Sequence, residues 1–174
     1  MKRVLIVIDM QNDFIDGSLG TKEAQAIVSG VTEKIQTYDG EVIYTMDTHK
    51  EDYLETVEGK KLPVIHCIKG TNGWNIQKNI MEAIQYKSNQ CFEKDTFGSI
   101  QLAQLMKEYY EHGLKEVELC GVCTDICVIS NALLIKAFAP QLEIFVDASC
   151  CAGVTKESHE NALEAMKMCH IQII

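Results

Sequence analysis

The chain has 174 residues, 47% of them hydrophobic, which is enough for one domain with a full core. Its formal net charge of −9 comes without a run of basic residues, which argues against nucleic acid or an anionic membrane as a partner. No apolar stretch approaches the roughly 20 residues that span a bilayer, and the N-terminal run lacks the h-region of a signal peptide, so we expect a cytoplasmic protein.

Strand-like and helix-like patterns alternate along the chain. Apolar runs predict strands at Val4–Asp9, Glu41–Asp47, Val117–Gly121, Leu142–Asp147 and Ile171–Ile174, and amphipathic stretches predict helices at about 21–38, 75–86, 99–112, 125–138 and 156–168. Because the strand runs are apolar almost throughout, they are typical of a parallel sheet buried on both faces. The alternation predicts one α/β domain over residues 1–174, with an open, mainly parallel sheet and helices on both faces, a Rossmann-like three-layer architecture.

Aspartate closes three of the predicted strands, at Asp9, Asp47 and Asp147. In an open α/β sheet, ligands bind beyond the carboxyl ends of the strands. Asp9 and Asp47 are therefore candidates for one shared cleft, and Asp9 could be the acid/base partner of a thiol. Asp147 is better explained as a turn former or helix N-cap.

Cys127 follows the apolar run Val117–Leu119 and a glycine-containing turn, which predicts a position in the first turn of a helix. The free backbone N–H groups and the helix dipole there favour a thiolate over a thiol. Cys127 is thus a candidate nucleophile, or alternatively a small buried apolar residue.

Eight cysteines could suggest disulfides, but most lie in apolar runs and we expect reduced thiols. Cys120, Cys123 and Cys127 have the spacing C-x2-C-x3-C. We do not expect a cysteine-ligated metal, because Cys120 should lie on a strand and Cys127 on a helix, with no fourth cysteine at ligand spacing.

A second group of polar residues has the pattern of a metal site. Asp47 and His49 lie two apart in an extended segment and project to the same side, and His66 offers a third ligand. Glu55 or Glu58, in the intervening loop, could complete the set. Two histidines and a carboxylate suit zinc, iron or manganese.

Lys94 lies on a short strand-like run just before a helix. It is either a solvated surface charge or a cation that reaches into the cleft. In the second case it would lower the pKa of both Cys127 and Asp9.

Taken together, these stretches resemble the isochorismatase-like cysteine hydrolases, and within them the nicotinamidases. Three segments carry the resemblance: Asp9–Phe14 (DMQNDF), Lys94–Gly98 (KDTFG) and Gly121–Val128 (GVCTDICV). The resemblance implies that Asp9 is the catalytic acid/base, Lys94 the catalytic lysine and Cys127 the nucleophile. It also implies a cis peptide at Val122–Cys123, with the backbone N–H groups of Cys123 and Cys127 facing the developing oxyanion.

Asp47, His49 and His66 resemble the nicotinamidase metal site, which holds the ring nitrogen of the substrate. Many nicotinamidases have a further histidine shortly after the Asp-x-His pair, where this chain offers only glutamates, and Glu58 is our choice by its position before His66. The resemblance therefore implies a divalent metal, zinc first, with iron or manganese as alternatives.

The aromatic residue often found just before the Pro-x-His stretch is also absent, and Leu62 stands in its place. Phe14, Trp74 or Phe97 would then supply the wall that stacks on the substrate ring.

The reaction implied by the resemblance is hydrolysis of a small carboxamide, nicotinamide to nicotinate and ammonia, through a thioester, with a role in NAD salvage and a homo-oligomer as a possible assembly. One alternative is a metal-independent family member that acts on another small amide or a vinyl ether. Another is a receiver-like signalling module, which also places aspartates and a lysine at strand ends. A third is a catalytically silent binding scaffold.

Overall fold

The computed structural model describes residues 3–87 and 90–174, which form an open six-stranded sheet. The strands are β1 (Arg3–Ile8), β2 (Glu41–Asp47), β3 (Gln90–Lys94), β4 (Glu116–Val122), β5 (Glu143–Ala152) and β6 (Gln172–Ile173). Their order is β3-β2-β1-β4-β5-β6, and every neighbouring pair is parallel. The predicted open α/β sheet is confirmed, and the short run before Lys94 is its edge strand β3.

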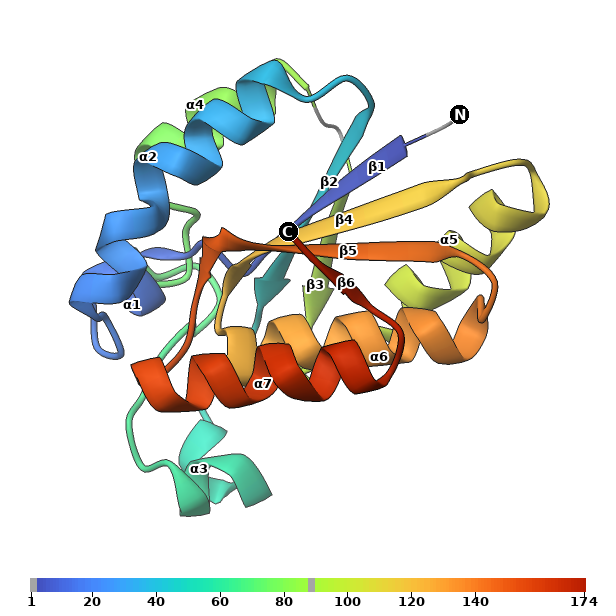
Figure 1. The fold of residues 1–174 in the computed structure, drawn as a ribbon. Coiled ribbons are helices and arrows are strands. Elements are labelled where there is room, and N and C mark those ends of the chain that lie inside the picture. The colour runs from blue at the N-terminus through green and yellow to red at the C-terminus, as the bar shows by residue number, and fades with distance from the viewer. Residues whose placement is uncertain (1–2, 88–89) are drawn as a thin grey trace.

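Helices cover both faces of the sheet (Figure 1). They are α1 (Asn12–Ile15), α2 (Lys22–Thr37), α3 (Val57–Lys61), α4 (Lys78–Gln85), α5 (Ile100–Glu111), α6 (Ile129–Phe138) and α7 (Lys156–Met168), with a 3-10 turn η1 (Tyr53–Glu55) and a π-helical turn η2 (Thr124–Val128). Helices α2 and α4 pack together on one side, and α6 packs against α5 and α7 on the other.

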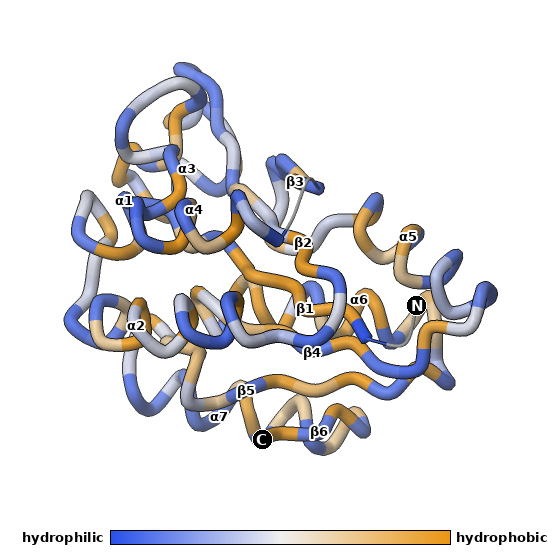
Figure 2. Tube along the Cα trace, turned by 90° about the horizontal axis from the view of Figure 1, so that it is seen from above, coloured by the Kyte–Doolittle hydropathy of each residue, from blue (hydrophilic) through white to orange (hydrophobic). Residues whose placement is uncertain are grey.

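The core lies between these layers. Hydrophobic residues follow the strands through the centre of the molecule (Figure 2). Residues 4–8 of β1, at the centre of the sheet, are completely buried, as strands covered on both faces should be.

Two neighbouring strands approach closely where the site begins. Gly121 on β4 has φ of 116°, and a Cβ atom at this position would lie 2.2 Å from the carbonyl oxygen of Ile8. Only glycine allows both the backbone conformation and the approach. The carboxyl ends of β1 and β4 are thereby brought together.

Strand β5 differs from the prediction, because Asp147 does not end it. The strand continues to Ala152. Leu119 lies opposite Val146 and Gly121 opposite Cys151, so residues 147–150 bulge opposite a single position of β4. The Asp147 carboxylate accepts hydrogen bonds from the backbone N–H groups of Ser149 and Cys150, so it shapes a bulge within the strand rather than a turn after it.

The stretch between Asp47 and His66 also differs, because it contains η1 and α3 where no element was predicted. Thr56 begins α3 by accepting a hydrogen bond from the backbone N–H of Gly59 at 3.0 Å. A Cβ atom at Gly59 would lie 2.1 Å from the carbonyl oxygen of Tyr53, so glycine lets α3 pack directly on η1.

Candidate active site

Four of the predicted site residues meet at one edge of the sheet because they lie at or beyond the carboxyl ends of four adjacent parallel strands. Asp9 comes directly after β1, Asp47 ends β2, Lys94 ends β3, and Cys127 lies in η2 beyond β4. The carboxyl ends of these strands point the same way, which is where an open α/β sheet binds ligands.

Lys94 is the centre of this group. Its Nζ atom lies 2.6 Å from Oδ2 of Asp9, 3.5 Å from Sγ of Cys127 and 3.6 Å from Oδ1 of Asp47. All four side chains are buried. The interpretation of Lys94 as a surface charge is therefore wrong, and its ammonium reaches into the cleft.

Asp9 is held in place by two hydrogen bonds with the hydroxyl of Thr45. Its backbone has φ of 48°, in the left-handed region. The hydroxyl of Thr45, on β2, donates to Oδ1 of Asp9 at 2.6 Å and accepts from the backbone N–H of Asp9 at 3.2 Å. Thr45 was not among the expected site residues, although its position two residues before Asp47 places it on the same strand and facing the same side.

Burial and the Lys94 ammonium shift the pKa values of Cys127 and Asp9 in opposite directions. Burial raises the pKa of the Cys127 thiol well above its usual value, Asp9 raises it further, and the Lys94 ammonium opposes both. Burial likewise raises the pKa of Asp9, and Lys94 again opposes it. Burial alone would lower the pKa of Lys94, but Asp9 and Cys127 raise it, so Lys94 is a permanent cation between two acidic groups.

Beside this group, Asp47, His49 and His66 bring ligand atoms within 4.8 Å of one another. Nε2 of His49 lies 2.9 Å and Nε2 of His66 lies 3.6 Å from Oδ2 of Asp47. Oε1 of Glu58 lies 3.8 Å from both of these nitrogens, whereas Glu55 is an exposed residue of η1. The glutamate that faces the cluster is therefore Glu58.

This cluster fits a divalent metal ion. Nε2 of His49 is buried and, despite its closeness to Asp47, has no hydrogen-bond partner in the described residues. Nδ1 of His66 lies 2.8 Å from the carbonyl oxygen of Val64, so when it donates there, Nε2 presents its lone pair to the cluster. Two imidazoles and a carboxylate with this orientation are the donor set of zinc and related ions.

Residues missed in the sequence analysis support the ligands. The Tyr53 ring packs 4.6 Å from the His49 ring and 4.9 Å from the His66 ring, between centroids. The Gln11 side chain accepts from the backbone N–H of Asp47 at 2.7 Å and donates to its carbonyl at 2.8 Å. Gln11 lies within the Asp9–Phe14 segment, although no role was expected for it, and Tyr53 has no sequence signal.

Asn131, another missed residue, ties the Cys127 turn to the segment before α5. Its Nδ2 atom donates to the carbonyl of Cys127 at 2.8 Å and to that of Phe97 at 3.1 Å. Its Oδ1 atom accepts from the backbone N–H of Ser99 at 2.9 Å. Asn131 is buried, and its position on α6, four residues after Cys127, directs it toward the same turn.

A cavity of about 650 Å³ opens over these groups. It is lined by Phe14, Leu19, Thr21, Asp47, Val57, Glu58, Lys61, Leu62, His66, Asp95, Thr96, Phe97, Cys123, Ile126, Cys127 and Val154. Phe14 and Phe97 are thus placed as wall residues. Trp74 is not, and this expectation is corrected: its indole N–H donates to Thr48 at 2.9 Å, outside the cavity.

The peptide bond between Val122 and Cys123 is cis. Cys123 lines the cavity. Its carbonyl accepts hydrogen bonds from the backbone N–H groups of Ile126 and Val128, and these two bonds close the turn η2. Cys127 therefore lies in a π-helical turn that leads into α6, rather than in the first turn of a regular helix.

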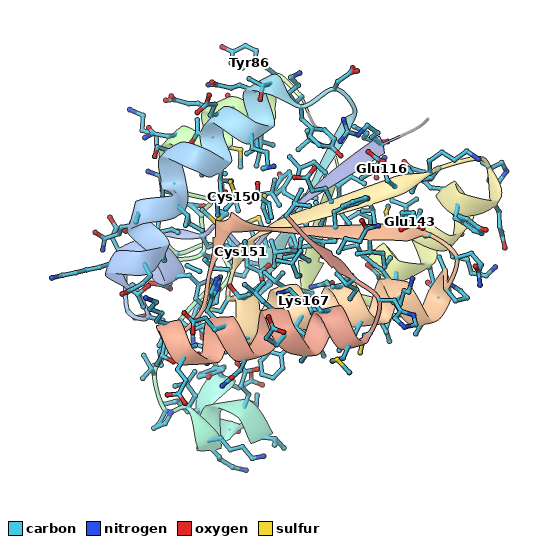
Figure 3. All side chains as sticks on the ribbon, in the orientation of Figure 1. Tyr86, Glu116, Glu143, Cys150, Cys151 and Lys167 are labelled. Carbon is cyan, nitrogen blue, oxygen red and sulfur yellow. The ribbon has the colours of Figure 1, made fainter. Side chains whose placement is uncertain are left out.

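All eight cysteines are free thiols, as predicted. Cys120 is fully buried on β4, whereas Cys127 is beyond the strand end, so the C-x2-C-x3-C spacing does not gather a ligand set. Cys150 and Cys151 lie on β5 beside α2 (Figure 3).

A buried thiol beside a carboxylate and an ammonium, under a cavity, is suited to acyl-transfer chemistry. The isochorismatase domain model matches residues 3–174. PncA, an isochorismatase family protein of Bacillus subtilis, is 31% identical over 94% of this chain and 93% of the relative. The nicotinamidase/pyrazinamidase of Mycobacterium tuberculosis is 26% identical over 99% of this chain and 98% of the relative.

Solved structures of related proteins are similar to this chain as well. The pyrazinamidase of Pyrococcus horikoshii, in complex with zinc, is 28% identical with a TM-score of 0.83, over 100% of this chain and 99% of that one. The pyrazinamidase/nicotinamidase of Streptococcus mutans is 29% identical with a TM-score of 0.85, over 99% and 100%. This chain belongs to the isochorismatase family. Because the family is shown, the receiver-like signalling module is excluded as the class of this protein. Within the described residues, no helix is long and apolar enough to cross a membrane.

Proposed function

We propose that this protein is a cysteine amidohydrolase that converts a small aromatic carboxamide, nicotinamide first, to its carboxylate and ammonia. The observation that carries the proposal is the contact of Lys94 with both Asp9 and Cys127, beside a cavity lined by Cys127 and by Asp47 and His66 of the Asp47–His49–His66 cluster. Relatives named nicotinamidase and pyrazinamidase, similar over nearly the whole chain, support the substrate class.

The first half-reaction forms a thioester. The Cys127 sulfur attacks the carboxamide carbon as the thiol proton passes to Asp9. The tetrahedral intermediate collapses when its C–N bond breaks, and Asp9 gives the proton to the departing ammonia. Lys94 stays charged throughout and compensates the negative charge shared by Asp9 and Cys127.

The second half-reaction restores the enzyme. Asp9 removes a proton from a water molecule, whose oxygen attacks the thioester carbon. The C–S bond breaks, the carboxylic acid leaves, and the proton held by Asp9 returns to the Cys127 sulfur. In both halves the backbone N–H groups of Cys123 and Cys127 would receive the oxyanion.

The residues Asp47, His49 and His66, with Glu58 beside them, would hold a divalent ion, zinc first and iron or manganese as alternatives. When bound, that ion supplies a Lewis acid to which a pyridine nitrogen can bind, so that the ring is oriented while the thiol does the chemistry. Phe14 and Phe97 form walls on which the ring can stack.

Ammonia release from nicotinamide, pyrazinamide, benzamide and an aliphatic amide tests this proposal. We expect nicotinamide and pyrazinamide to be hydrolysed far faster than benzamide, which lacks a ring nitrogen. Equal rates with benzamide, or unchanged nicotinamide hydrolysis after chelation, would instead favour the metal-independent alternative.

The nucleophile is tested by two matched variants. Cys127→Ala should abolish turnover and leave the circular dichroism spectrum unchanged, whereas Cys123→Ala, which keeps its backbone N–H, should retain most activity. Appreciable activity in Cys127→Ala with loss in Cys123→Ala would reverse the assignment. No ammonia from any amide would leave the silent-scaffold alternative standing.

A further inference from the structure

The cavity is larger than a bare pyridine carboxamide requires. Its volume, about 650 Å³, is typical of sites that enclose a drug-sized ligand, whereas nicotinamide is a single ring with one amide. Cys127, Asp47 and His66 are buried at the cavity's deep end. A ring bound over these three residues leaves the outer part of the cavity unfilled.

The outer part carries four apolar side chains, next to the exposed polar residues Lys61, Asp95 and Thr96. Val57, Leu62, Phe97 and Val154 line it and are 74%, 37%, 46% and 52% exposed, and we call these four the apolar rim. Single exposed apolar side chains are ordinary, but these come from three separate segments and line one cavity. An apolar substituent bound there would cover part of this rim, next to a ring that stacks on Phe97.

The apolar rim is also held in place by hydrogen bonds to the site. The backbone N–H of Val154 donates to the carboxylate of Asp125, in the Cys127 turn, at 3.1 Å. The carbonyl of Leu62 accepts from the hydroxyl of Tyr53, which packs on the cluster histidines, at 2.9 Å. A ligand would therefore lose little affinity to ordering of the protein.

We propose that the preferred substrates are aromatic primary carboxamides with an apolar ring substituent of about butyl or phenyl size. This inference rests on the proposed function. The amide lies over Cys127 and the substituent fills the apolar rim. The reaction is unchanged: the amide C–N bond breaks, water supplies the hydroxyl and proton, and ammonia leaves.

The test uses nicotinamides with a butyl or phenyl group at each free ring carbon. We expect at least one position to give a KM threefold or more below that of nicotinamide. The ratio of the KM of nicotinamide to the KM of the substituted amide, three or more in the wild type, should fall to one or less in Val57→Ser and in Val154→Ser. Ile100→Ser is the matched control, because Ile100 is 60% exposed but does not line the cavity, and the ratio should be kept.

No gain at any ring position, or a gain that survives both rim variants, overturns the proposal. A second copy of the chain covering the rim is another outcome against it: Val57→Ser would then lower the mass measured by light scattering, and no extended amide would gain. Calorimetry with Cys127→Ala separates the two proposals. Tighter binding of an extended amide without turnover by the wild type refutes the proposed function but supports the apolar rim.

Discussion

At the scale of single residues, we propose that Lys94 controls the reactivity of the Cys127 thiol. Its ammonium touches both Asp9 and Cys127 in a site where burial raises the pKa of both acids. The cation opposes the effect of burial on the pKa of both acids, whereas the hydrogen bond from Thr45 lowers the pKa of Asp9 alone. We expect Lys94→Ala to move the pH profile of Cys127 alkylation by iodoacetamide to higher pH and to slow alkylation at pH 7.

The matched control is Lys61→Ala, because Lys61 lines the same cavity but is exposed. Its alkylation profile should stay at the wild-type position. Labelled peptides identified by mass spectrometry keep the measurement on Cys127. An identical profile in Lys94→Ala would show that the ammonium has no influence on the thiol.

Asn131 acts one step further from the chemistry, as a positioning residue. Its three hydrogen bonds hold the Cys127 carbonyl, the Phe97 carbonyl and the Ser99 N–H. Asn131→Asp keeps the acceptor and removes the donor, which should cost about 1 kcal/mol of stability per bond lost. We expect kcat to fall about tenfold or more, since misplacement of the attacking group by a fraction of an ångström is costly.

A merely structural role would lower the melting temperature without changing kcat of the folded fraction. Active-site titration of that fraction distinguishes the two. Asn79→Asp, at an exposed position of α4, is the control and should leave both quantities unchanged.

At the scale of elements, α2 is attached to the sheet by a buried ion cluster. Nζ of Lys34, on α2, lies 2.6 Å from Oδ2 of Asp147 on β5 and in direct contact with Glu118 on β4. Both carboxylates are buried. Lys34→Met should destabilise the protein by about 3 kcal/mol at pH 7, because it leaves two buried carboxylates uncompensated.

This effect should depend on pH. Burial alone would raise the pKa of Asp147, but the hydrogen bond from Lys34 brings it below its usual value. The stability from this pairing is therefore present above the unfolded pKa and is lost as pH falls through the folded one. Urea unfolding should give a smaller difference between wild type and Lys34→Met at pH 3 than at pH 7. Lys107→Met, which breaks an exposed pair with Glu111, should change stability little at either pH.

The elements also show what the sequence could reveal. The strands could be predicted because β1 and β4 are buried on both faces and are apolar almost throughout. Ligands bind beyond the carboxyl ends of such strands, and this placed Asp9 and Asp47 in one cleft. The ligands Asp47, His49 and His66 were predicted from their spacing and from the resemblance. The elements η1 and α3 between them were not predicted, because their few residues show no clear helical pattern. The extra length of β5 depends on a bulge at Asp147 that is set by its hydrogen bonds, and Trp74 was misplaced because its partner, Thr48, is a tertiary contact.

At the scale of the whole molecule, a ligand that binds only the folded chain stabilises all of it. Asp47 ends β2, His49 lies two residues beyond it, and His66 lies in the loop after α3, so the three are together only in the folded protein. A metal ion at about a hundredfold above its Kd should add about 2.7 kcal/mol to the free energy of unfolding. For a chain of this size, that corresponds to a rise of about 5–10 °C in Tm.

Calorimetric scans of the chelator-treated protein with and without zinc measure this rise and need no substrate. His49→Ala should lose most of it, because Nε2 of His49 is the buried donor without a hydrogen-bond partner in the described residues. Glu58→Gln should lose part of it, whereas Glu55→Gln should keep it in full, since only Glu58 faces both histidines. A zinc-induced rise that persists in His49→Ala would place the ion elsewhere, and no rise in the wild type would mean that the cluster is held by its own ion pairs alone.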